Sequence, residues 1–242
     1  MEIINGDALR LIDNMQSNVF DLIILDPNYQ DWQKIIQSGF ISKCVNSLRN
    51  DGNLILFTKQ PFDYELRAAI NDIFRREIIW SFDNGGAWVS KKMPLVSFQK
   101  IYWCIKSKDF YFNPRTGNDY QENTRNFKRT CKIWEGYKAE GRQFQKSEEG
   151  TWIRDHIHYN KPLTGEIPSK PEELIQIIVR CFCRPGGKIF NPFAGSGTVE
   201  RIAIHEKRDI VSIEIDEKRW YAIIDDLLSE TKRQEQSIYG NQ

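Results

Sequence analysis

Four consecutive residues, Asp26-Pro27-Asn28-Tyr29, combine a carboxylate, a rigid proline, a polar side chain and an aromatic ring. They come directly after the apolar run 22–25, which has the length and composition of a buried strand. Because α/β proteins bind ligands at the carboxyl ends of parallel strands, this position suits a binding site. Such a set can accept hydrogen bonds from an amine while it stacks on a flat ring. The alternative is an ordinary proline turn in which Tyr29 is a packing residue.

A second candidate site follows the predicted strand 188–190, where the chain continues as Asn191-Pro192-Phe193-Ala194-Gly195-Ser196-Gly197-Thr198. Two glycines in a tight turn between a strand and a helix let a ligand approach bare backbone N–H groups. The next predicted strand, 209–215, carries Glu214 near its end. An acidic residue at such a strand end typically accepts hydrogen bonds from the ribose hydroxyls of a nucleoside cofactor. The loop is not GxGxxG, which disfavours NAD and FAD.

The elements that must position both sites alternate between strand and helix, as a parallel open sheet requires. Periodicity and turn signals predict strands at 2–4, 22–25, 53–58, 77–82 and 100–106 and helices at 8–15, 32–48 and 62–73. Later in the chain, Ser169 is predicted to cap a helix that has Pro171 in its first turn. The polar stretch after about residue 230 is predicted to be a frayed tail. The fold class is therefore α/β.

The segment 107–165 interrupts this pattern, because it shows no sustained helical or strand periodicity. It is rich in aromatic residues, and between Lys106 and Lys146 it contains ten Lys and Arg against five Asp and Glu. Basic groups interleaved with aromatic rings suit nucleic acid, through phosphate contacts and base stacking. The alternative is an extended surface subdomain with a small core of its own.

Composition sets wider bounds on the class of protein. The net charge is +1, so a basic surface for nucleic acid has to be local. The five cysteines are scattered and form no CxxC pair, so neither a zinc site nor a disulfide framework is expected, and no metal is predicted. No signal peptide and no apolar run of membrane-spanning length occurs in the sequence, which predicts a cytoplasmic protein without membrane association.

Together the two motifs resemble those of the DNA amino-methyltransferases, which modify adenine N6 or cytosine N4. That family carries a [DNS]PP[YFW] tetrapeptide and a DPFxGSGT cofactor loop, and the order here resembles its β arrangement. Supporting matches are Asn5-Gly6-Asp7-Ala8, the lead-in 48–54 and Ser169-Lys170-Pro171. The resemblance covers about 1–106 and 165–228. Cytosine C5 methylation is excluded, because it needs a Pro-Cys loop that this chain lacks.

The resemblance implies a Rossmann-like methyltransferase fold that uses S-adenosylmethionine, with a mostly parallel, seven-stranded sheet. Its expected parts are a catalytic half (1–106), a target-recognition insert (107–165), a cofactor-binding half (166–230) and a polar tail (231–242). The expected activity is site-specific methylation of the N6 amine of an adenine flipped out of double-stranded DNA. An initial aspartate in the tetrapeptide is commoner with adenine, and this family association favours adenine over cytosine N4.

The same resemblance assigns roles to individual residues. The catalytic residues are Asp26, Pro27, Asn28 and Tyr29, of which Asp26 and the Pro27 carbonyl accept the amine hydrogens and Tyr29 stacks on the base. The cofactor-binding residues are Asp7, Ala8, Asp26, Lys170, Asn191, Pro192, Phe193, Ala194, Gly195, Ser196, Gly197, Thr198, Glu214 and Ile215. The expected DNA contacts are Arg125, Lys128, Arg129, Lys132 and Arg142. The resemblance also implies two protein partners, namely a second copy of the chain in a homodimer and a restriction endonuclease.

Two residues depart from the family pattern. Asn28 stands where the second proline is usual, and Asn191 stands where the cofactor loop usually begins with aspartate. Asparagine keeps hydrogen-bonding capacity at position 191 but loses a charge that could pair with the cofactor's ammonium group. These departures keep two alternatives open beside the adenine enzyme, namely a cytosine-N4 methyltransferase and a catalytically weak nucleic-acid-binding relative.

Overall fold

The computed structural model describes residues 1–84, 94–115, 152–163 and 169–239. In this part of the chain the strands form one sheet, in the order β1-β8-β7-β2-β3-β5-β4-β6. The strands are β1 (Glu2–Asn5), β2 (Phe20–Leu25), β3 (Leu48–Thr58), β4 (Phe74–Ser81), β5 (Phe98–Ile105), β6 (His156–His158), β7 (Lys188–Asn191) and β8 (Asp209–Glu214). The α-helices are α1 (Ala8–Leu11), α2 (Trp32–Gln37), α3 (Phe40–Ser47), α4 (Asp63–Ala69), α5 (Glu172–Phe182), α6 (Thr198–His205) and α7 (Glu217–Tyr239).

The sheet is mostly parallel, which confirms the predicted fold class. Strand β5 runs antiparallel to both of its neighbours, β3 and β4, and the other strand pairs of the described residues are parallel. The described residues contain eight strands rather than seven, because β6 adds to the edge at β4. This strand has three residues, which is too short for a periodic pattern to reveal it in the sequence.

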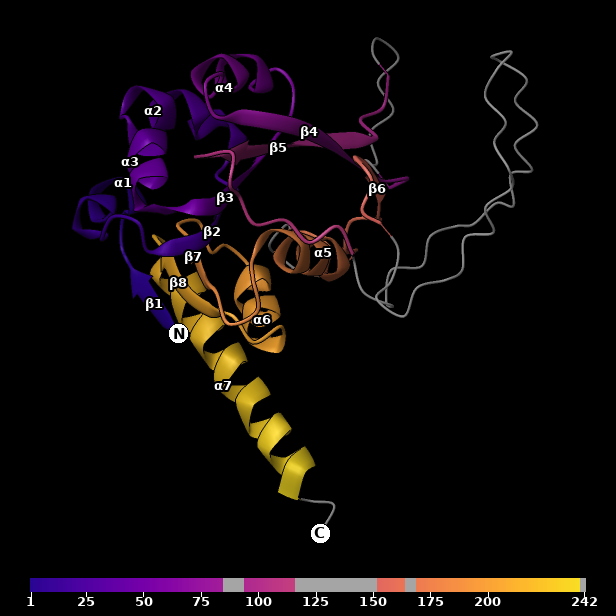
Figure 1. Ribbon diagram of the computed structural model, residues 1–242. Helices are drawn as coiled ribbons and strands as arrows, with labels where there is room; N and C mark the ends of the chain where they lie inside the picture. Colours follow the sequence, from indigo (N-terminus) through magenta and orange to yellow (C-terminus); the bar gives the residue numbers. More distant parts are fainter. Residues whose placement is uncertain (85–93, 116–151, 164–168, 240–242) are drawn as a thin grey trace.

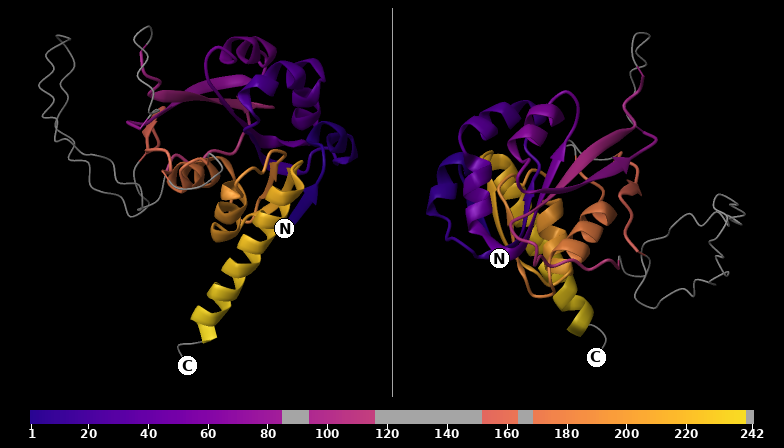
Figure 2. Two further views of the ribbon diagram at one scale, coloured as in Figure 1. Left: turned by 180° about the vertical axis from the view of Figure 1, so that it is seen from behind. Right: turned by 45° about the horizontal axis from the view of Figure 1, so that its top comes forward.

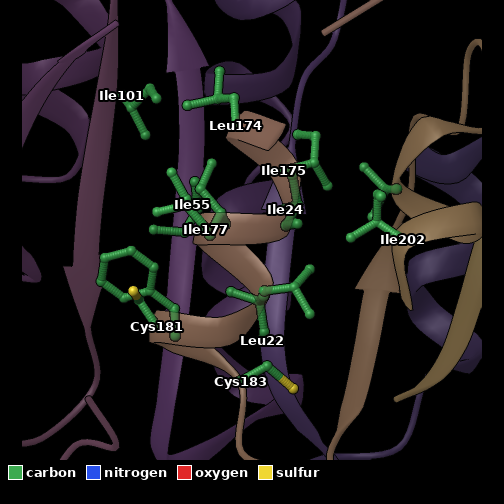
Figure 3. Close-up of a cluster of buried hydrophobic side chains, with 14 of the residues drawn as sticks. Leu22, Ile24, Ile55, Ile101, Leu174, Ile175, Ile177, Cys181, Cys183 and Ile202 are labelled. Carbon is green, nitrogen blue, oxygen red and sulfur yellow. The ribbon is translucent and has the colours of Figure 1, made fainter. Parts of the chain in front are cut away.

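Strand β2 shows why the apolar run before the tetrapeptide is unbroken. Its side chains alternate between the two faces of the sheet, and both faces are covered. Leu22 and Ile24 pack in one core with residues of α5 and α6 (Figure 3). Ile23 and Leu25 pack in the other core with residues of α2, α3 and α4. All four are fully buried, and each such side chain stabilises the fold by roughly 1.5–3 kcal/mol.

The sheet order brings the two ends of the sequence together. Strand β7, from the last third of the chain, pairs with β2 in parallel, with Leu22 opposite Ile189 and Ile23 opposite Phe190. Strands β8 and β1 follow on the far side of β7, while β3 lies on the other side of β2. The strand order therefore changes direction between β2 and β7, and ligands of open α/β sheets bind at the carboxyl ends of strands at such a point.

Three local predictions differ from the structure. The predicted helix 32–48 is two helices, because Gly39 takes a left-handed conformation (φ 71°) between α2 and α3. Helix α5 begins after Pro171, so Ser169 is not its cap. Helix α7 continues to Tyr239, and the segment 231–242, expected to be a polar tail, therefore starts inside a helix that extends away from the sheet (Figures 1 and 2).

Asn53 on β3 ties the beginning of the segment 107–165 to the core. Its side chain is fully buried, and its Nδ2 donates to the backbone carbonyls of Tyr111 (2.7 Å) and Phe182 (2.9 Å). Its Oδ1 accepts from Nε1 of Trp103 (2.8 Å). Because a buried amide is costly unless it is hydrogen-bonded, these contacts fix where residues after β5 leave the sheet.

Candidate active site

The two sequence motifs open into one cavity of about 580 Å3 at the carboxyl ends of β2 and β7. All four predicted catalytic residues line it, and so does the predicted cofactor set apart from one glycine. The exception is Gly197, which lies at the N-terminus of α6 with φ 76°. A Cβ there would lie 3.2 Å from the side chain of Ile223 on α7, so this glycine lets α7 pack closely against the start of α6.

Asp26 at the end of β2 is held by a lysine from the other half of the chain. The Lys170 ammonium forms an ion pair with Oδ2 of Asp26 and lies 4.8 Å from the centre of the Phe57 ring. Both side chains are largely buried, with 15% of Lys170 and 26% of Asp26 exposed. The sequence assigned Lys170 to the cofactor set, and the structure gives it a direct contact with the predicted catalytic carboxylate. Pro27, the next residue, is buried and fixes the chain direction behind Asp26.

Tyr29 is fixed at its hydroxyl end and leaves its ring beside the cavity. Its hydroxyl donates to Oε1 of Gln99 (2.8 Å), and Gln99 belongs to β5. Burial, and after it the charge of Asp26, raises the pKa of Tyr29 far above its ordinary value. The side chain therefore stays a neutral phenol. Lys59 Nζ lies 5.0 Å from the centre of the ring.

The glycine loop is closed onto Glu214 at the end of β8. The backbone N–H of Gly195 donates to Oε2 of Glu214 (2.7 Å), and that of Asp216 donates to Oε1 (2.9 Å). Gly195 takes a left-handed conformation (φ 60°), which allows the turn that brings its N–H to the carboxylate. Glu214 is only 5% exposed and lines the cavity. A carboxylate fixed at both oxygens is a preorganised acceptor for a ligand hydroxyl.

The end of β1 lies beside the end of β8. Gly6 N–H donates to the Glu214 carbonyl (3.0 Å), and Asn5 Nδ2 donates to the same oxygen (2.9 Å). The Asp7 side chain caps α1 by accepting from the Leu9 N–H (2.9 Å), a structural role that the sequence analysis did not assign. Asp7 and Ala8 both line the cavity.

Several cavity residues were missed by the sequence analysis. Trp80 on β4 and Gln99 on β5 line the cavity next to the tetrapeptide. Trp80 falls in the predicted strand 77–82, and Gln99 lies one residue before the predicted strand 100–106. Four further basic side chains, Lys34, Lys59, Lys161 and Arg219, also line it. Burial, and after it the charges of Lys59 and Lys170, lowers the pKa of Lys161. Lys59, Lys161 and Lys170 are thus close enough to repel one another.

Some sequence predictions concern residues outside the described ranges. Arg125, Lys128, Arg129, Lys132 and Arg142, the expected DNA contacts, all lie in 116–151. Among the residues that the structure describes, no group of three or more His, Cys, Asp or Glu side chains could hold a metal ion. No helix in the same part of the chain is long and apolar enough to span a membrane.

The donors and acceptors around the glycine loop fit S-adenosylmethionine. Glu214 can accept from ribose hydroxyls, and Ile215 and Phe193 offer apolar surface for a purine ring. The bare backbone at Gly195 allows a close approach of the ligand. On the other side of the cavity stand the acceptors Asp26 and Pro27, within the same enclosure.

A mostly parallel sheet with a glycine loop, an acidic strand end and an acceptor tetrapeptide in one cavity defines an S-adenosylmethionine-dependent methyltransferase fold. Residues 18–225 match the family model of the N6/N4 DNA methylases, and the chain belongs to this family. The predicted resemblance is therefore confirmed, and S-adenosylmethionine is the cofactor of this family.

Known proteins of both base specificities are similar to this chain. DNA adenine methyltransferase YhdJ of Escherichia coli (strain K12) is 25% identical over 88% of this chain and 78% of its own length. The M1.HpyAVI–SAM complex superposes with a TM-score of 0.66 at 17% identity, covering 93% of this chain and 98% of that one. The cytosine-N4-specific PvuII DNA methyltransferase has a TM-score of 0.67 at 13% identity, covering 92% and 84%.

Proposed function

We propose that the protein is a site-specific methyltransferase that transfers the methyl group of S-adenosylmethionine to the N6 amine of an adenine flipped out of double-stranded DNA. The observation that carries this proposal is the single cavity shared by the tetrapeptide 26–29 and the glycine loop 191–198. Such a cavity puts hydrogen-bond acceptors for an amine within reach of a bound methyl donor. Adenine is favoured over cytosine by the aspartate that begins the tetrapeptide, and the similarity to an adenine methyltransferase supports the same choice.

In this mechanism the protein activates a poor nucleophile by accepting its hydrogens. The lone pair of an exocyclic amine is delocalised into the base, so the amine must become pyramidal before it can attack. We assign one hydrogen to Oδ1 of Asp26 and the other to the Pro27 carbonyl, because Lys170 already binds Oδ2 of Asp26. Pro27 fixes the direction of that carbonyl at little entropic cost. Transfer would form the N–CH3 bond as the bond from the methyl group to the sulfonium sulfur breaks, with its electron pair going to sulfur. The amine would release one proton to Asp26 or to solvent, so the protein's part consists of positioning and electrostatics.

Two sets of residues hold the reactants in this proposal. When bound, S-adenosylmethionine supplies an electrophilic methyl group on its sulfonium. Glu214 accepts from its ribose hydroxyls, and the backbone of the loop 193–196 encloses it. On the opposite side, Tyr29 stacks on the target base, with Trp80 and Gln99 as further walls of the base pocket. The segment 107–165 is the proposed target-recognition insert, with Arg125, Lys128, Arg129, Lys132 and Arg142 as its proposed DNA contacts.

Two lysines of the cavity provide a prediction about DNA. We expect Lys59 and Lys161, which line the cavity from two different segments of the chain, to bind phosphates that flank the flipped nucleotide. The Lys59→Ala/Lys161→Ala double variant should bind duplex DNA more weakly at low salt. Its plot of log affinity against log salt should be shallower by about 0.9 for each phosphate that is no longer neutralised by a lysine. Fluorescence anisotropy across a salt series measures both quantities.

A matched double variant controls for the removal of two charges. Lys188 is the first residue of β7, and Lys207 lies two residues before β8. Both are therefore at the end of the sheet opposite the cavity. Lys188→Ala/Lys207→Ala removes the same charge, and its salt slope should equal that of the wild type. Equal slopes for the two double variants would contradict a role of Lys59 and Lys161 in DNA binding.

The experiment that tests the proposed function identifies the methylated base. The protein is incubated with mixed-sequence duplex DNA and S-adenosylmethionine carrying a deuterated methyl group, and the DNA is digested to nucleosides for mass spectrometry. Labelled N6-methyl-2′-deoxyadenosine supports the proposal, and labelled N4-methyl-2′-deoxycytidine would show that the target base is cytosine instead. If neither base is labelled and calorimetry shows no binding of S-adenosylmethionine, the protein is instead the catalytically weak, nucleic-acid-binding relative. Sequencing of the methylated DNA then gives the recognition sequence.

A further inference from the structure

A buried polar cluster lies directly behind the cofactor loop. Asn191 at the end of β7 donates from Nδ2 to Oε1 of Glu200 (2.8 Å), and the Ser212 hydroxyl on β8 donates to the same oxygen (2.6 Å). The three side chains come from β7, α6 and β8, and at most 1% of each is exposed. Asn191 also lines the cavity, whereas Glu200 lies behind it.

Glu200 is an unusual residue for this position on a helix. A carboxyl group in a fully buried environment is costly, and it is retained where its hydrogen bonds fix a geometry. Burial raises the pKa of Glu200 above its ordinary value. Among the described residues, Oε2 has no hydrogen-bond partner, so Oε1 carries both contacts. A leucine of similar size would avoid this penalty but would take the acceptor away from the Asn191 amide and the Ser212 hydroxyl, so what Glu200 supplies here is a fixed orientation of these two groups.

The task follows from the orientation of the Asn191 amide. An asparagine side chain can present either its oxygen or its nitrogen to a ligand, and the two ends have opposite hydrogen-bonding character. Since Nδ2 is held by Glu200, the remaining polar atom is Oδ1, which accepts only a long hydrogen bond (3.4 Å) from the Phe193 N–H. Glu200 therefore holds the rotamer of Asn191 in which Oδ1, and not Nδ2, is the polar atom left for a ligand of the cavity that Asn191 lines.

We propose that Glu200 is a positioning residue for the cofactor, holding Asn191 so that its Oδ1 accepts a hydrogen bond from the ammonium group of S-adenosylmethionine. In this chain an amide and a buried acid, nine positions apart in the sequence, replace the single aspartate that usually begins the loop. The inference rests on the proposed function, because it concerns how the methyl donor is bound.

The test compares two substitutions at position 200 by calorimetry with two ligands. Glu200→Leu removes the acceptor and lets Asn191 turn, so affinity for S-adenosylmethionine should fall about tenfold, the effect of one charge-assisted hydrogen bond. Glu200→Gln keeps a carbonyl acceptor for Asn191 and should bind the cofactor almost as the wild type does. The second ligand is methylthioadenosine, which keeps the nucleoside and sulfur but lacks the ammonium group. Its affinity should be the same in all three proteins.

A background variant checks that Glu200 acts through Asn191. In Asn191→Ala protein, adding Glu200→Leu should cause no further decrease of S-adenosylmethionine affinity, since there is no amide left to position. Thermal unfolding confirms that each variant is folded. Equal decreases for both ligands would show a merely structural role, and no decrease for either would equally overturn the inference. A wild-type protein that binds neither ligand would contradict the proposed function. A wild-type protein that binds both, with variants that do not differ as expected, would contradict only the role of Glu200.

Discussion

Replacing Asp26 with asparagine is expected to lower the rate of methyl transfer to DNA by roughly 100- to 1,000-fold, the usual effect of removing one positioned group at a developing charge. Asparagine keeps the shape of the side chain, but its contact with Lys170 is no longer an ion pair. It has a single carbonyl oxygen, which then has to serve either Lys170 or the amine. The measurement is single-turnover transfer of a labelled methyl group at saturating S-adenosylmethionine, which separates chemistry from cofactor affinity.

An exposed aspartate outside the cavity provides the control for Asp26. Asp72 lies in the turn between α4 and β4, and the same aspartate-to-asparagine change there should leave the rate unchanged. Calorimetry with S-adenosylmethionine shows whether the Asp26 variant still binds the cofactor, since Asp26 is also in the proposed cofactor set. A variant that methylates DNA as fast as the Asp72 control would mean that another group accepts the amine hydrogens.

The ion pair explains how Asp26 can be both buried and correctly oriented. A largely buried carboxylate requires a partner, and the free energy of the pair depends on geometry that only the folded chain supplies. Lys170 comes from the segment just before α5, and Asp26 from the end of β2. The proposed catalytic and cofactor-binding halves of the sequence are therefore joined at the proposed acceptor of the amine hydrogens. A change in how α5 packs would alter the acceptor as well as the cofactor site.

The two motifs could be predicted from the sequence because their signals are local. An apolar run of strand length precedes each of them, and Pro27, Pro192 and the paired glycines mark the turns that follow. Parallel strands place their carboxyl ends at one edge of the sheet, so the sequence could also predict that both motifs lie together there. The residues 26–29 and 191–196 indeed line one cavity.

The remaining cavity residues could not be predicted, because their signals resemble those of other structural roles. Trp80 and Gln99 belong to strands that look like ordinary aromatic and β-branched runs. Only the pairing of β5 with β3 and β4 puts Gln99 within reach of the Tyr29 hydroxyl and sets Trp80 opposite Gln99. Glu200 follows the glycine loop on a helix, where a charged residue usually faces solvent. Its burial depends on β8 covering α6, which is a tertiary contact. Lys161 lies in a segment without periodicity.

Tyr29 is the residue whose removal should most affect the capture of the base. Stacking of an aromatic side chain on an unpaired base is worth roughly 1–3 kcal/mol, so Tyr29→Ala should lower kcat/KM for duplex DNA by about 5- to 150-fold. Tyr29→Phe keeps the ring and removes only the hydrogen bond to Gln99. It should retain most of the activity, because stacking uses the face of the ring and not the hydroxyl. Steady-state kinetics on a duplex with the mapped recognition sequence measures both variants.

A mismatched duplex separates stacking from other roles of Tyr29. Extruding a base from a duplex costs a few kcal/mol, and this cost is smallest where the base is already unpaired. If Tyr29 stabilises the extruded base, the Tyr29→Ala defect should shrink when the target adenine is mispaired, while Tyr29→Phe stays close to wild type on both duplexes. An equal defect on matched and mismatched DNA would instead place Tyr29 in the chemical step, beside the Asp26 carboxylate whose charge contributes to its raised pKa.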